Sequence, residues 1–581
     1  MTYRRFKYEA PLYALAFIIA LFVRFIQLGA LPLTDAEAAP ALQALRISQG
    51  EDPALSPHPL YILSTSVMFL LFGGGTNFLA RTIPALIGGL LVLAPLLFDD
   101  RLKPRPSLLL AFFLALDPGL VAISRQTASP ILAITFLVFT AGFINKKKYQ
   151  PAAITAALAL LSGPSVWFGL LSLLIAYPIS RFLLVRKPTK ETGGEKQEAS
   201  DLQPFDTASP VGATPSTFII HSSTFIPFLF TFFLAGTLFF TVPGGLGATF
   251  SSIPAFINDW RSLSDITRGM LFISLLIYQP FALLLSIVAL IRGWTRGLRR
   301  IMVLSIWLFI PLLLVVFLPA REMADLAWML IPLNALASLE LARHISIYPD
   351  ERREVAGVAL LTLFIWVFAW LGMAGINFLP VGTPDYRLRA GMLIGSLLLL
   401  VVSLILVAAG WSIRIARIGG VWGLAVALGV LSLSGTFGST GLRGLYAPEM
   451  WWLPGIPLQE SLLRETVSQV SELGRGNDHV ASIAILGVNS PALEWALRGN
   501  PVQFVDTLDT DSAPDFVITP FESNPVSLES AYRGQDFIWR QTPIWRYADT
   551  AAWFRWVSLR EMPQSRELII LWAKSNLFLD E

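Results

Sequence analysis

Residues 389–411 read RAGMLIGSLLLLVVSLILVAAGW, and the only charge in this stretch is Arg389 at its start. An α-helix needs about 20 mostly apolar residues to cross the hydrocarbon core of a bilayer. Comparable runs recur from residue 11 to residue 438. We therefore predict a polytopic α-helical membrane protein with about 13 spans. The predicted spans are 11–30, 78–98, 107–124, 128–145, 150–163, 165–185, 218–240, 269–291, 300–318, 325–345, 355–379, 389–411 and 419–438.

The composition supports this class and excludes others. Of the 581 residues, 54% are hydrophobic and 14% are charged, whereas a soluble domain carries about 25% charged residues. The formal net charge of +3 gives no basic field that would attract nucleic acid, so we expect no nucleic-acid partner. The sequence has no cysteine, which excludes disulfides and thiolate metal sites. The four histidines lie far apart in the sequence, which argues against a histidine-rich metal centre.

Loop charges predict the orientation in the membrane. Residues 60–72 (LYILSTSVMFLLF) are apolar but too short to cross comfortably, so we expect an interfacial or re-entrant helix there. If they do not cross, every loop on the side of the N-terminus is rich in lysine and arginine, as cytoplasmic loops are. We therefore expect an integral plasma-membrane protein with a cytoplasmic N-terminus, near Arg4, Arg5 and Lys7. The first outer loop is then 31–77, with interfacial helices.

Composition also divides the chain. Residues 1–440 form the predicted transmembrane module, and residues 186–216 within it are polar enough to predict a disordered cytoplasmic loop. Residues 446–581 predict an extracytoplasmic α/β domain that contains several of the 17 tryptophans, which either pack in its core or stack on sugar rings. Its predicted elements are strands at 481–487, 502–508 and 515–519, and a helix at 490–499 capped by Ser490.

Two carboxylates follow the first span, in LPLTDAEAAP (31–40). Asp35 and Glu37 lie where the outer face of the membrane is expected. An ionised carboxylate there can act as a general base toward an acceptor hydroxyl. The alternative is that Asp35 only caps the helix expected at 36–48, because acidic residues favour helix N-termini. From these residues alone, both interpretations stay open.

Several basic residues are candidates for binding a phosphate. Arg125, in the outer turn Ser124-Arg125-Gln126, lies between two apolar spans; it either pairs with a phosphate, whose oxygens match a guanidinium, or snorkels to lipid headgroups. Arg321 precedes a later span and either binds phosphate or pairs with Glu322. His58 stands before residues 60–72 and is either a phosphate contact or a surface histidine. Arg81 either lines the same outer face or snorkels.

The order of these motifs resembles a known family. An acidic motif follows the first span, then SPHPLYILSTSVMFLLFG (56–73), FLARTIPALIGGLLVLAPLLF (78–98) and LALDPGLVAISRQTASPILAITFLVF (114–139). This order is similar to the N-terminal half of GT-C superfamily membrane glycosyltransferases, and most similar to family-39-like relatives of dolichyl-phosphate-mannose-type mannosyltransferases. The resemblance is specific over 31–145 and looser beyond it. It extends less securely to the C-terminal domain, through SPALEWALRGNPVQFVDTL (490–508) and YRGQDFIW (532–539).

The resemblance implies transfer of a sugar, with inversion, from a polyprenyl-phosphate donor to a protein, lipid or glycan acceptor at the outer membrane face. It implies that Asp35 is the catalytic carboxylate, supported by Glu37. It also implies that His58, Ser124, Arg125 and Arg321 contact the donor phosphate. The sequence departs from the family in two places, since Ala36 separates the two carboxylates and His58 replaces a lysine.

Alternatives to this function remain. A non-catalytic GT-C-like protein that assists lipid-linked glycan assembly or flipping would share the same motifs. A secondary transporter would place charged groups near the middle of several spans, and the predicted spans are almost uncharged there. No cofactor is required by the sequence, although the acidic first loop could hold one divalent cation.

Overall fold

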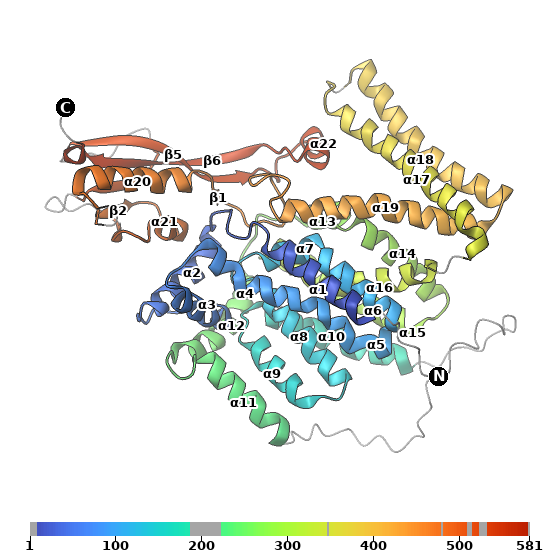
Figure 1. Cartoon of the computed structure of the whole chain (residues 1–581), viewed down its shortest axis with the longest axis horizontal. Coiled ribbons are helices and arrows are strands. Elements are labelled where there is room, and N and C mark those ends of the chain that lie inside the picture. The colour runs from blue at the N-terminus through green and yellow to red at the C-terminus, as the bar shows by residue number, and fades with distance from the viewer. Residues whose placement is uncertain are drawn as a thin grey trace.

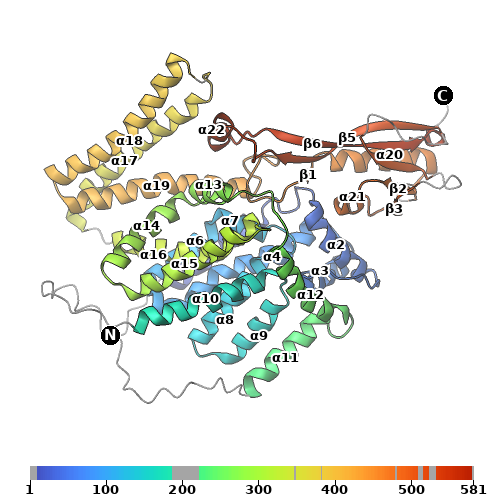
Figure 2. The ribbon, with the colours of Figure 1, turned by 180° about the vertical axis from the view of Figure 1, so that it is seen from behind.

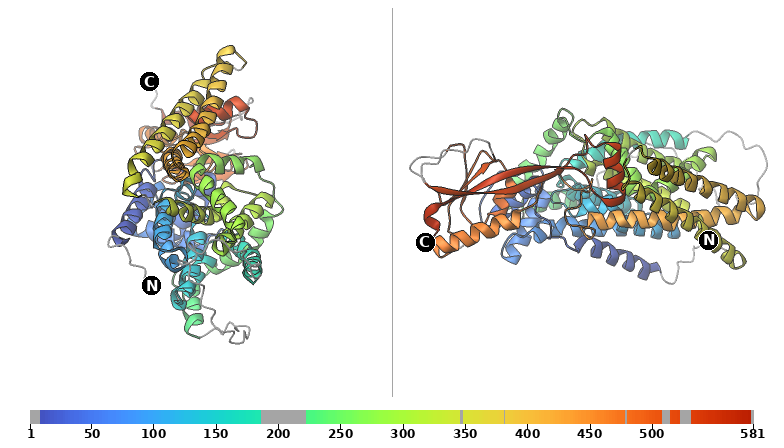
Figure 3. Two further views of the ribbon diagram at one scale, coloured as in Figure 1. Left: turned by 90° about the vertical axis from the view of Figure 1, so that its right-hand side faces the viewer. Right: turned by 90° about the horizontal axis from the view of Figure 1, so that it is seen from above.

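The structure is a computed structural model that describes residues 9–185, 222–345, 348–380, 382–477, 480–507, 514–521 and 531–578. The predicted cytoplasmic loop 186–216 and the basic residues Arg4, Arg5 and Lys7 lie outside the described residues. Most of the described chain is an elongated bundle of helices, and the C-terminal domain lies at one end of its long axis (Figures 1 and 3).

The bundle comprises helices of very different lengths, several of which lie side by side along its long axis (Figure 2). Two further helices, α2 (Asp35–Ser48) and α3 (Pro59–Phe72), lie within residues 31–77, the predicted first outer loop. The helices of the bundle are α1 (Glu9–Phe25), α4 (Asn77–Leu90), η1 (Leu91–Phe98), α5 (Asp99–Leu102), α6 (Pro104–Leu116), α7 (Pro118–Ser124), α8 (Ile131–Asn145), α9 (Tyr149–Leu160), α10 (Ser165–Val185), α11 (Ser222–Gly236), α12 (Gly244–Asp259), α13 (Arg268–Tyr278), α14 (Pro280–Thr295), α15 (Arg299–Phe317), η3 (Met323–Leu326), α16 (Ala327–Leu341), η4 (Ala342–His344), η5 (Pro349–Glu351), α17 (Arg352–Ile376), α18 (Pro384–Gly410) and α19 (Ile413–Ser439).

The predicted number of spans is not confirmed. Within the described residues, 7 helices are long and apolar enough to cross a membrane, or up to 9 if each of two bent pairs is one span. Several of the remaining predicted spans correspond to shorter helices, such as α8 and α9, with 15 and 12 residues. Helix α3 has 14 residues, or about 21 Å at 1.5 Å per residue, which is short for a hydrocarbon core of about 30 Å.

Two predicted spans are broken at a proline. Helices α6 and α7 meet at a 55° bend before Pro118, and α13 and α14 meet at a 96° bend before Pro280. Each proline stands at the first position of the second helix, where its missing N–H costs nothing. Proline also disfavours helical geometry in the residue before it. The predicted span 269–291 is therefore two helices at nearly a right angle.

The C-terminal domain is built on a mixed six-stranded sheet with the order β1-β5-β6-β4-β2-β3. Three of the predicted strands are present as β2, β3 and β4, and the predicted helix at 490–499 is α21, capped by Ser490 as expected. The long antiparallel pair β5–β6 extends along the domain (Figure 1). The elements are β1 (Ile456–Pro457), α20 (Glu460–Arg475), β2 (Ile483–Leu486), α21 (Pro491–Ala496), β3 (Val502–Val505), β4 (Phe516–Pro520), β5 (Tyr532–Pro543), α22 (Thr550–Leu559), β6 (Gln564–Lys574) and η6 (Ser575–Leu577).

Several tryptophans of this domain are buried, and two of them, Trp495 and Trp556, pack against Phe69 of α3 and Tyr278 of α13. Trp495, Trp539 and Trp556 are fully buried. Trp545 and Trp553 lie against Trp556, with ring centroids 5.1 and 5.7 Å from it. Each such side chain buries a large apolar area, and edge-to-face contacts add a further increment. For these residues, the core-packing interpretation agrees with the structure better than sugar stacking does.

Candidate functional site

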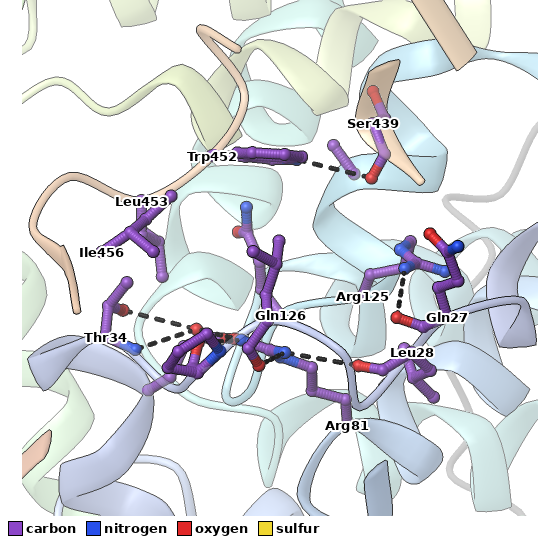
Figure 4. Close-up of a pocket in the computed structure, with 14 residues that line it drawn as sticks. Gln27, Leu28, Thr34, Arg81, Arg125, Gln126, Ser439, Trp452, Leu453 and Ile456 are labelled. Atoms are coloured by element: carbon purple, nitrogen blue, oxygen red, sulfur yellow. Dashed lines mark hydrogen bonds and ion pairs between the residues drawn. The ribbon is translucent and has the colours of Figure 1, made fainter. Parts of the chain in front are cut away.

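A small pocket lies where the predicted first outer loop meets the end of α7, beneath the segment that leads into the C-terminal domain (Figure 4). Its volume is about 40 Å³, which has room for a few water molecules but not for a sugar. The residues that line it are Gln27, Leu28, Leu31, Pro32, Thr34, Glu37, Arg81, Ala122, Arg125, Gln126, Ser439, Trp452, Leu453 and Ile456.

Glu37 and Arg81 form a buried ion pair on one wall of this pocket. Arg81 Nε and Nη2 donate to the two carboxylate oxygens of Glu37 over 2.8 and 2.7 Å, the bidentate geometry that gives the strongest pairs. Their side chains are only 3% and 7% exposed. The backbone N–H of Thr34 also donates to Glu37, closing a capping box at the start of α2. Both oxygens of Glu37 are thus occupied by groups of the membrane module.

Arg125 contributes a second guanidinium to the pocket. Its two terminal nitrogens donate to five backbone carbonyls, those of Val23, Arg24, Ile26, Gln27 and Thr440. The first four belong to the C-terminal end of α1 and the turn after it, where carbonyls lack helical partners and attract cations. Arg125 therefore joins the ends of α1, α7 and α19 at one point, and its side chain is drawn beside Gln27 in Figure 4.

The acidic loop and the Ser-Arg-Gln turn are in direct contact. Thr127 Oγ1 donates to the backbone carbonyl of Glu37 over 2.9 Å. Gln126, next to Arg125, donates from its side-chain amide to the carbonyl of Trp451 over 2.6 Å. This contact attaches the same turn to residues 452–456, which form the roof of the pocket. The structure therefore brings together Glu37, Arg81 and Arg125, three of the residues that the sequence singled out.

Asp35 lies beside the pocket and does not line it. It is the first residue of α2, but its carboxylate points to the C-terminal domain. There it accepts hydrogen bonds from Ser490 Oγ at 2.5 Å and from the backbone N–H of Ala492 at 3.1 Å. It also pairs with Arg540, whose Nη2 is 2.5 Å away. Besides starting its own helix, Asp35 therefore binds the first turn of α21 and strand β5.

Ser124 and His58 are not brought to the pocket. Ser124 is fully buried between helices, where its hydroxyl donates to the carbonyl of Leu120 and accepts from Arg24. His58 packs against the turn at Gly163, where a Cβ would lie 2.6 Å from the imidazole ring. Burial lowers the pKa of His58 to about 4, so that at neutral pH it carries no charge to offer a phosphate.

Arg321 lies in the loop between α15 and η3 and does not line the pocket. Its Nε donates to the carbonyl of Leu318 and its Nη1 to that of Ile266, both from neighbouring loop segments. Neither the predicted approach to Arg125 nor the alternative ion pair with Glu322 is found among the described contacts. In this conformation Arg321 holds two loop segments together.

Sequence reasoning missed a polar network inside the bundle. Arg24 of α1 is fully buried and donates to Ser124 and to the carbonyls of Ala20, Leu114 and Ala115. Asp117, at the break between α6 and α7, accepts from the backbone of Leu120 and from the side chain of Asn334. Intramembrane ionisable groups are rare and partnered. The Asp117-Pro118 pair was a signal for this helix break, because aspartate caps a helix that proline begins.

A metal site receives no support from the described residues. Among them, no group of three or more histidine, aspartate or glutamate side chains is placed to hold a metal ion. The divalent cation allowed for in the first loop therefore has no ligand set there, because Glu37 is paired with Arg81 and Asp35 with Arg540.

Comparison with known proteins identifies the fold. No protein-family model and no curated protein match the sequence. The structure is similar to that of ArnT from Cupriavidus metallidurans bound to undecaprenyl phosphate, with a TM-score of 0.54, 12% identity, and coverage of 98% of this chain and 99% of that one. The apo form of ArnT gives a TM-score of 0.52 at 13% identity, covering 98% and 100% of the chains.

An oligosaccharyltransferase from Archaeoglobus fulgidus in its apo form gives a TM-score of 0.38 at 13% identity, covering 85% of this chain and 64% of that one. The likeness to ArnT spans nearly the whole of both chains, so it includes the C-terminal domain as well as the helical bundle. The resemblance read from the motifs of residues 31–145 agrees with this finding at the level of the fold, which is that of ArnT.

Proposed function

We propose that this protein is a membrane glycosyltransferase that moves a sugar from a polyprenyl-phosphate donor to an acceptor at the outer membrane face. The observation that carries the proposal is the convergence of Glu37, Arg81 and Arg125 in one pocket. This pocket lies between the acidic loop and the Ser-Arg-Gln turn, in a chain with the fold of ArnT, which has been crystallised with undecaprenyl phosphate. The acceptor is a protein, a lipid or a glycan.

The phosphate of the donor would bind at the arginine side of the pocket. Arg125 presents a guanidinium group there, and its charge stabilises the negative charge that grows on the phosphate as the glycosidic bond breaks. Within the described residues, Arg125 bonds only to backbone carbonyls, which carry no formal charge. A phosphate would therefore meet a cation that no carboxylate has neutralised.

We assign the role of general base to Asp35, for a structural reason. Glu37 is held by a buried arginine of its own module, so freeing it would leave an unpaired buried charge. Asp35 is 28% exposed and is held by a separate domain. In the proposed reaction the acceptor hydroxyl oxygen attacks the anomeric carbon and its proton passes to Asp35. The bond from that carbon to the phosphate oxygen breaks, its electron pair leaves with the lipid phosphate, and the anomeric configuration inverts.

The test is a transfer assay with the Asp35→Asn variant. Membranes that contain the wild-type or variant protein are supplied with radiolabelled polyprenyl-phosphate sugars, and label that leaves the lipid is counted. Removing a general base lowers such rates by about 100-fold to 10,000-fold. The matched control is Asp52→Asn, the same change at an exposed residue of the same loop. Near wild-type transfer by Asp35→Asn would show that Asp35 is not the base.

One observation favours a second candidate, a non-catalytic GT-C-like protein that assists lipid-linked glycan assembly or flipping. In the structure both carboxylates of the acidic motif have basic partners, Glu37 with Arg81 and Asp35 with Arg540. A protein of this second kind would bind the donor lipid without turnover. The same assay separates the candidates, because donor binding without transfer by the wild-type protein would favour the second.

A further inference from the structure

The C-terminal domain holds Asp35 with three donors from two separate elements. Ser490 and the backbone N–H of Ala492 come from the start of α21, and Arg540 comes from β5. Trp539 Nε1 in turn donates to Ser490 Oγ over 3.1 Å. This contact fixes the hydroxyl group that donates a hydrogen bond to Asp35. The carboxylate of a membrane-module residue is thus directed away from the pocket by contacts that all belong to the other domain.

Arg540 also contacts a second carboxylate, that of Glu567. The two residues are cross-strand partners on β5 and β6, and Arg540 Nη1 lies 3.1 Å from Glu567 Oε2. The pairing register of β5 and β6 shifts between Ile538 and Arg540, and such a bulge re-aims the side chains beside it. Arg540 can therefore release Asp35 without becoming an unpaired cation, which removes the main cost of breaking a partly buried ion pair.

The same strand edge carries the roof of the pocket. Ile456 of β1 lines the pocket and is paired with Gln541, and the next residue, Pro457, is paired with Arg540 itself. The backbone of Leu458 also bonds to the carbonyl of Trp539 over 3.1 Å. Because β1 is bonded to β5 at this point, movement of the roof away from the pocket also draws Arg540 away from Asp35.

Donor binding requires such a movement. A pocket of about 40 Å³ holds water but no sugar, and its far wall is made of the buried Glu37–Arg81 pair. The roof consists of Trp452 and Leu453, from the segment between the two domains, and of Ile456 of β1, and it lies opposite Arg81 and Leu28 (Figure 4). Opening the pocket at the roof therefore leaves the buried Glu37–Arg81 ion pair intact, whereas opening it at the opposite wall would break that pair.

We propose that the Asp35–Arg540 ion pair is a latch, by which the C-terminal sheet keeps the pocket closed and holds Asp35 outside it. When the pair breaks, Arg540 stays with Glu567 and moves with the roof, and the carboxylate of Asp35 loses its only charged partner among the described residues. The latch deepens the proposed function, because the consequence for catalysis rests on Asp35 being the base. Opening of the pocket does not depend on that assignment.

The experiment measures how fast a buried pocket residue becomes accessible. The natural chain has no cysteine, so Leu28→Cys introduces a single thiol at a pocket-lining residue that is 2% exposed. The rate of its reaction with a water-soluble maleimide reports opening of the pocket in the full-length protein. In this background we expect Arg540→Gln to raise the rate about fivefold, the change that a partly buried ion pair supports.

Three further variants sharpen the test. Arg540→Lys keeps the positive charge and should react at close to the parent rate. Glu567→Gln removes the competing partner, favours the closed arrangement and should slow the reaction. The matched control is Arg46→Gln, which breaks another ion pair between α2 and the C-terminal domain, with Glu494, and leaves Asp35 untouched; it should leave the rate unchanged.

Two results would overturn the latch. One is equal reaction rates in the Arg540→Gln and parent proteins. The other is an equal increase in Arg540→Gln and Arg46→Gln, which would mean that any loosening of the domain contact opens the pocket. Sugar transfer, measured separately, tests the proposed function: its absence alongside the predicted labelling pattern would refute the transferase and leave the latch standing.

Discussion

The buried ion pair of Glu37 and Arg81 holds together the chain segments that line the pocket. The two carboxylate oxygens of Glu37 accept hydrogen bonds from Arg81. Arg81 also donates to the carbonyls of Leu28, Leu31 and Pro32. One guanidinium thereby fixes the turn after α1 and the first turn of α2 together. The residues that shape the pocket are thus held by a pair whose partners lie 44 positions apart in the sequence.

We predict that Glu37→Gln lowers the free energy of unfolding by about 3–5 kcal/mol, because it leaves a buried guanidinium without its counter-charge. Thermal unfolding of the detergent-solubilised protein measures this. The control is Arg555→Gln, which removes an exposed pair with Glu561 at 4.0 Å, worth about 0.5 kcal/mol. Similar losses in the two variants would contradict the structural role assigned to Glu37.

His58 gives a prediction about pH. Its pKa of about 4 in the folded protein lies below the usual value of about 6.5, so the unfolded chain takes up a proton first as the pH falls. Stability that is present above pH 6.5 should therefore be lost progressively toward pH 4. Unfolding temperatures measured across this range should depend less on pH in His58→Gln than in the wild type. An unchanged pH dependence would show that His58 is not held neutral.

At the scale of elements, close helix contacts set the position of Arg125. Gly88 of α4 faces Ser124 of α7, and a Cβ on Gly88 would lie 2.1 Å from the Ser124 hydroxyl oxygen. The absence of a side chain at Gly88 therefore lets α4 pack directly on the helix that ends at Arg125. Helix α4 also carries Arg81, so this contact relates the two guanidinium groups of the pocket.

Gly88→Ala should therefore lower stability by about 1–3 kcal/mol, the usual cost of overpacking, and weaken donor binding. Gly357→Ala on α17, where a Cβ meets nothing within 4 Å, should be neutral or slightly stabilising. Thermal unfolding of both variants checks the comparison. Equal stability in the two variants would mean that α4 and α7 are less closely packed than the structure indicates.

The helices and strands differ in how well the sequence predicts them. Long apolar runs such as 389–411 predict their helices well, because hydropathy alone decides them. The bend before Pro280 and the contact of Asp35 with β5 could not be predicted in this way, because they depend on tertiary contacts. Glu37, Arg81 and Arg125 were found because charge at a membrane surface needs a partner. Their partners, which for Arg125 are backbone carbonyls, could not be identified without the three-dimensional structure.

For the whole molecule, the sidedness of the C-terminal domain remains a prediction from loop charges. In the cysteine-free chain, Tyr547→Cys places one thiol at a residue of this domain that is 80% exposed. We expect an impermeant maleimide to label it in intact cells, with the outer envelope opened if the cell has one. Arg296→Cys, in an exposed turn after α14 that we place in the cytoplasm, should react only after the plasma membrane is permeabilised. The opposite pattern would invert the topology.

The most direct test of the central claim, that the pocket binds the donor phosphate, is protection of a pocket thiol by lipid. Maleimide labelling of Leu28→Cys is measured in the full-length protein with undecaprenyl phosphate, with undecaprenol and without lipid, beside an Asp52→Cys control in the exposed part of the first loop. We predict that undecaprenyl phosphate slows labelling at residue 28 severalfold more than undecaprenol does, and leaves residue 52 unaffected. Equal labelling of residue 28 with both lipids would contradict a phosphate site in this pocket.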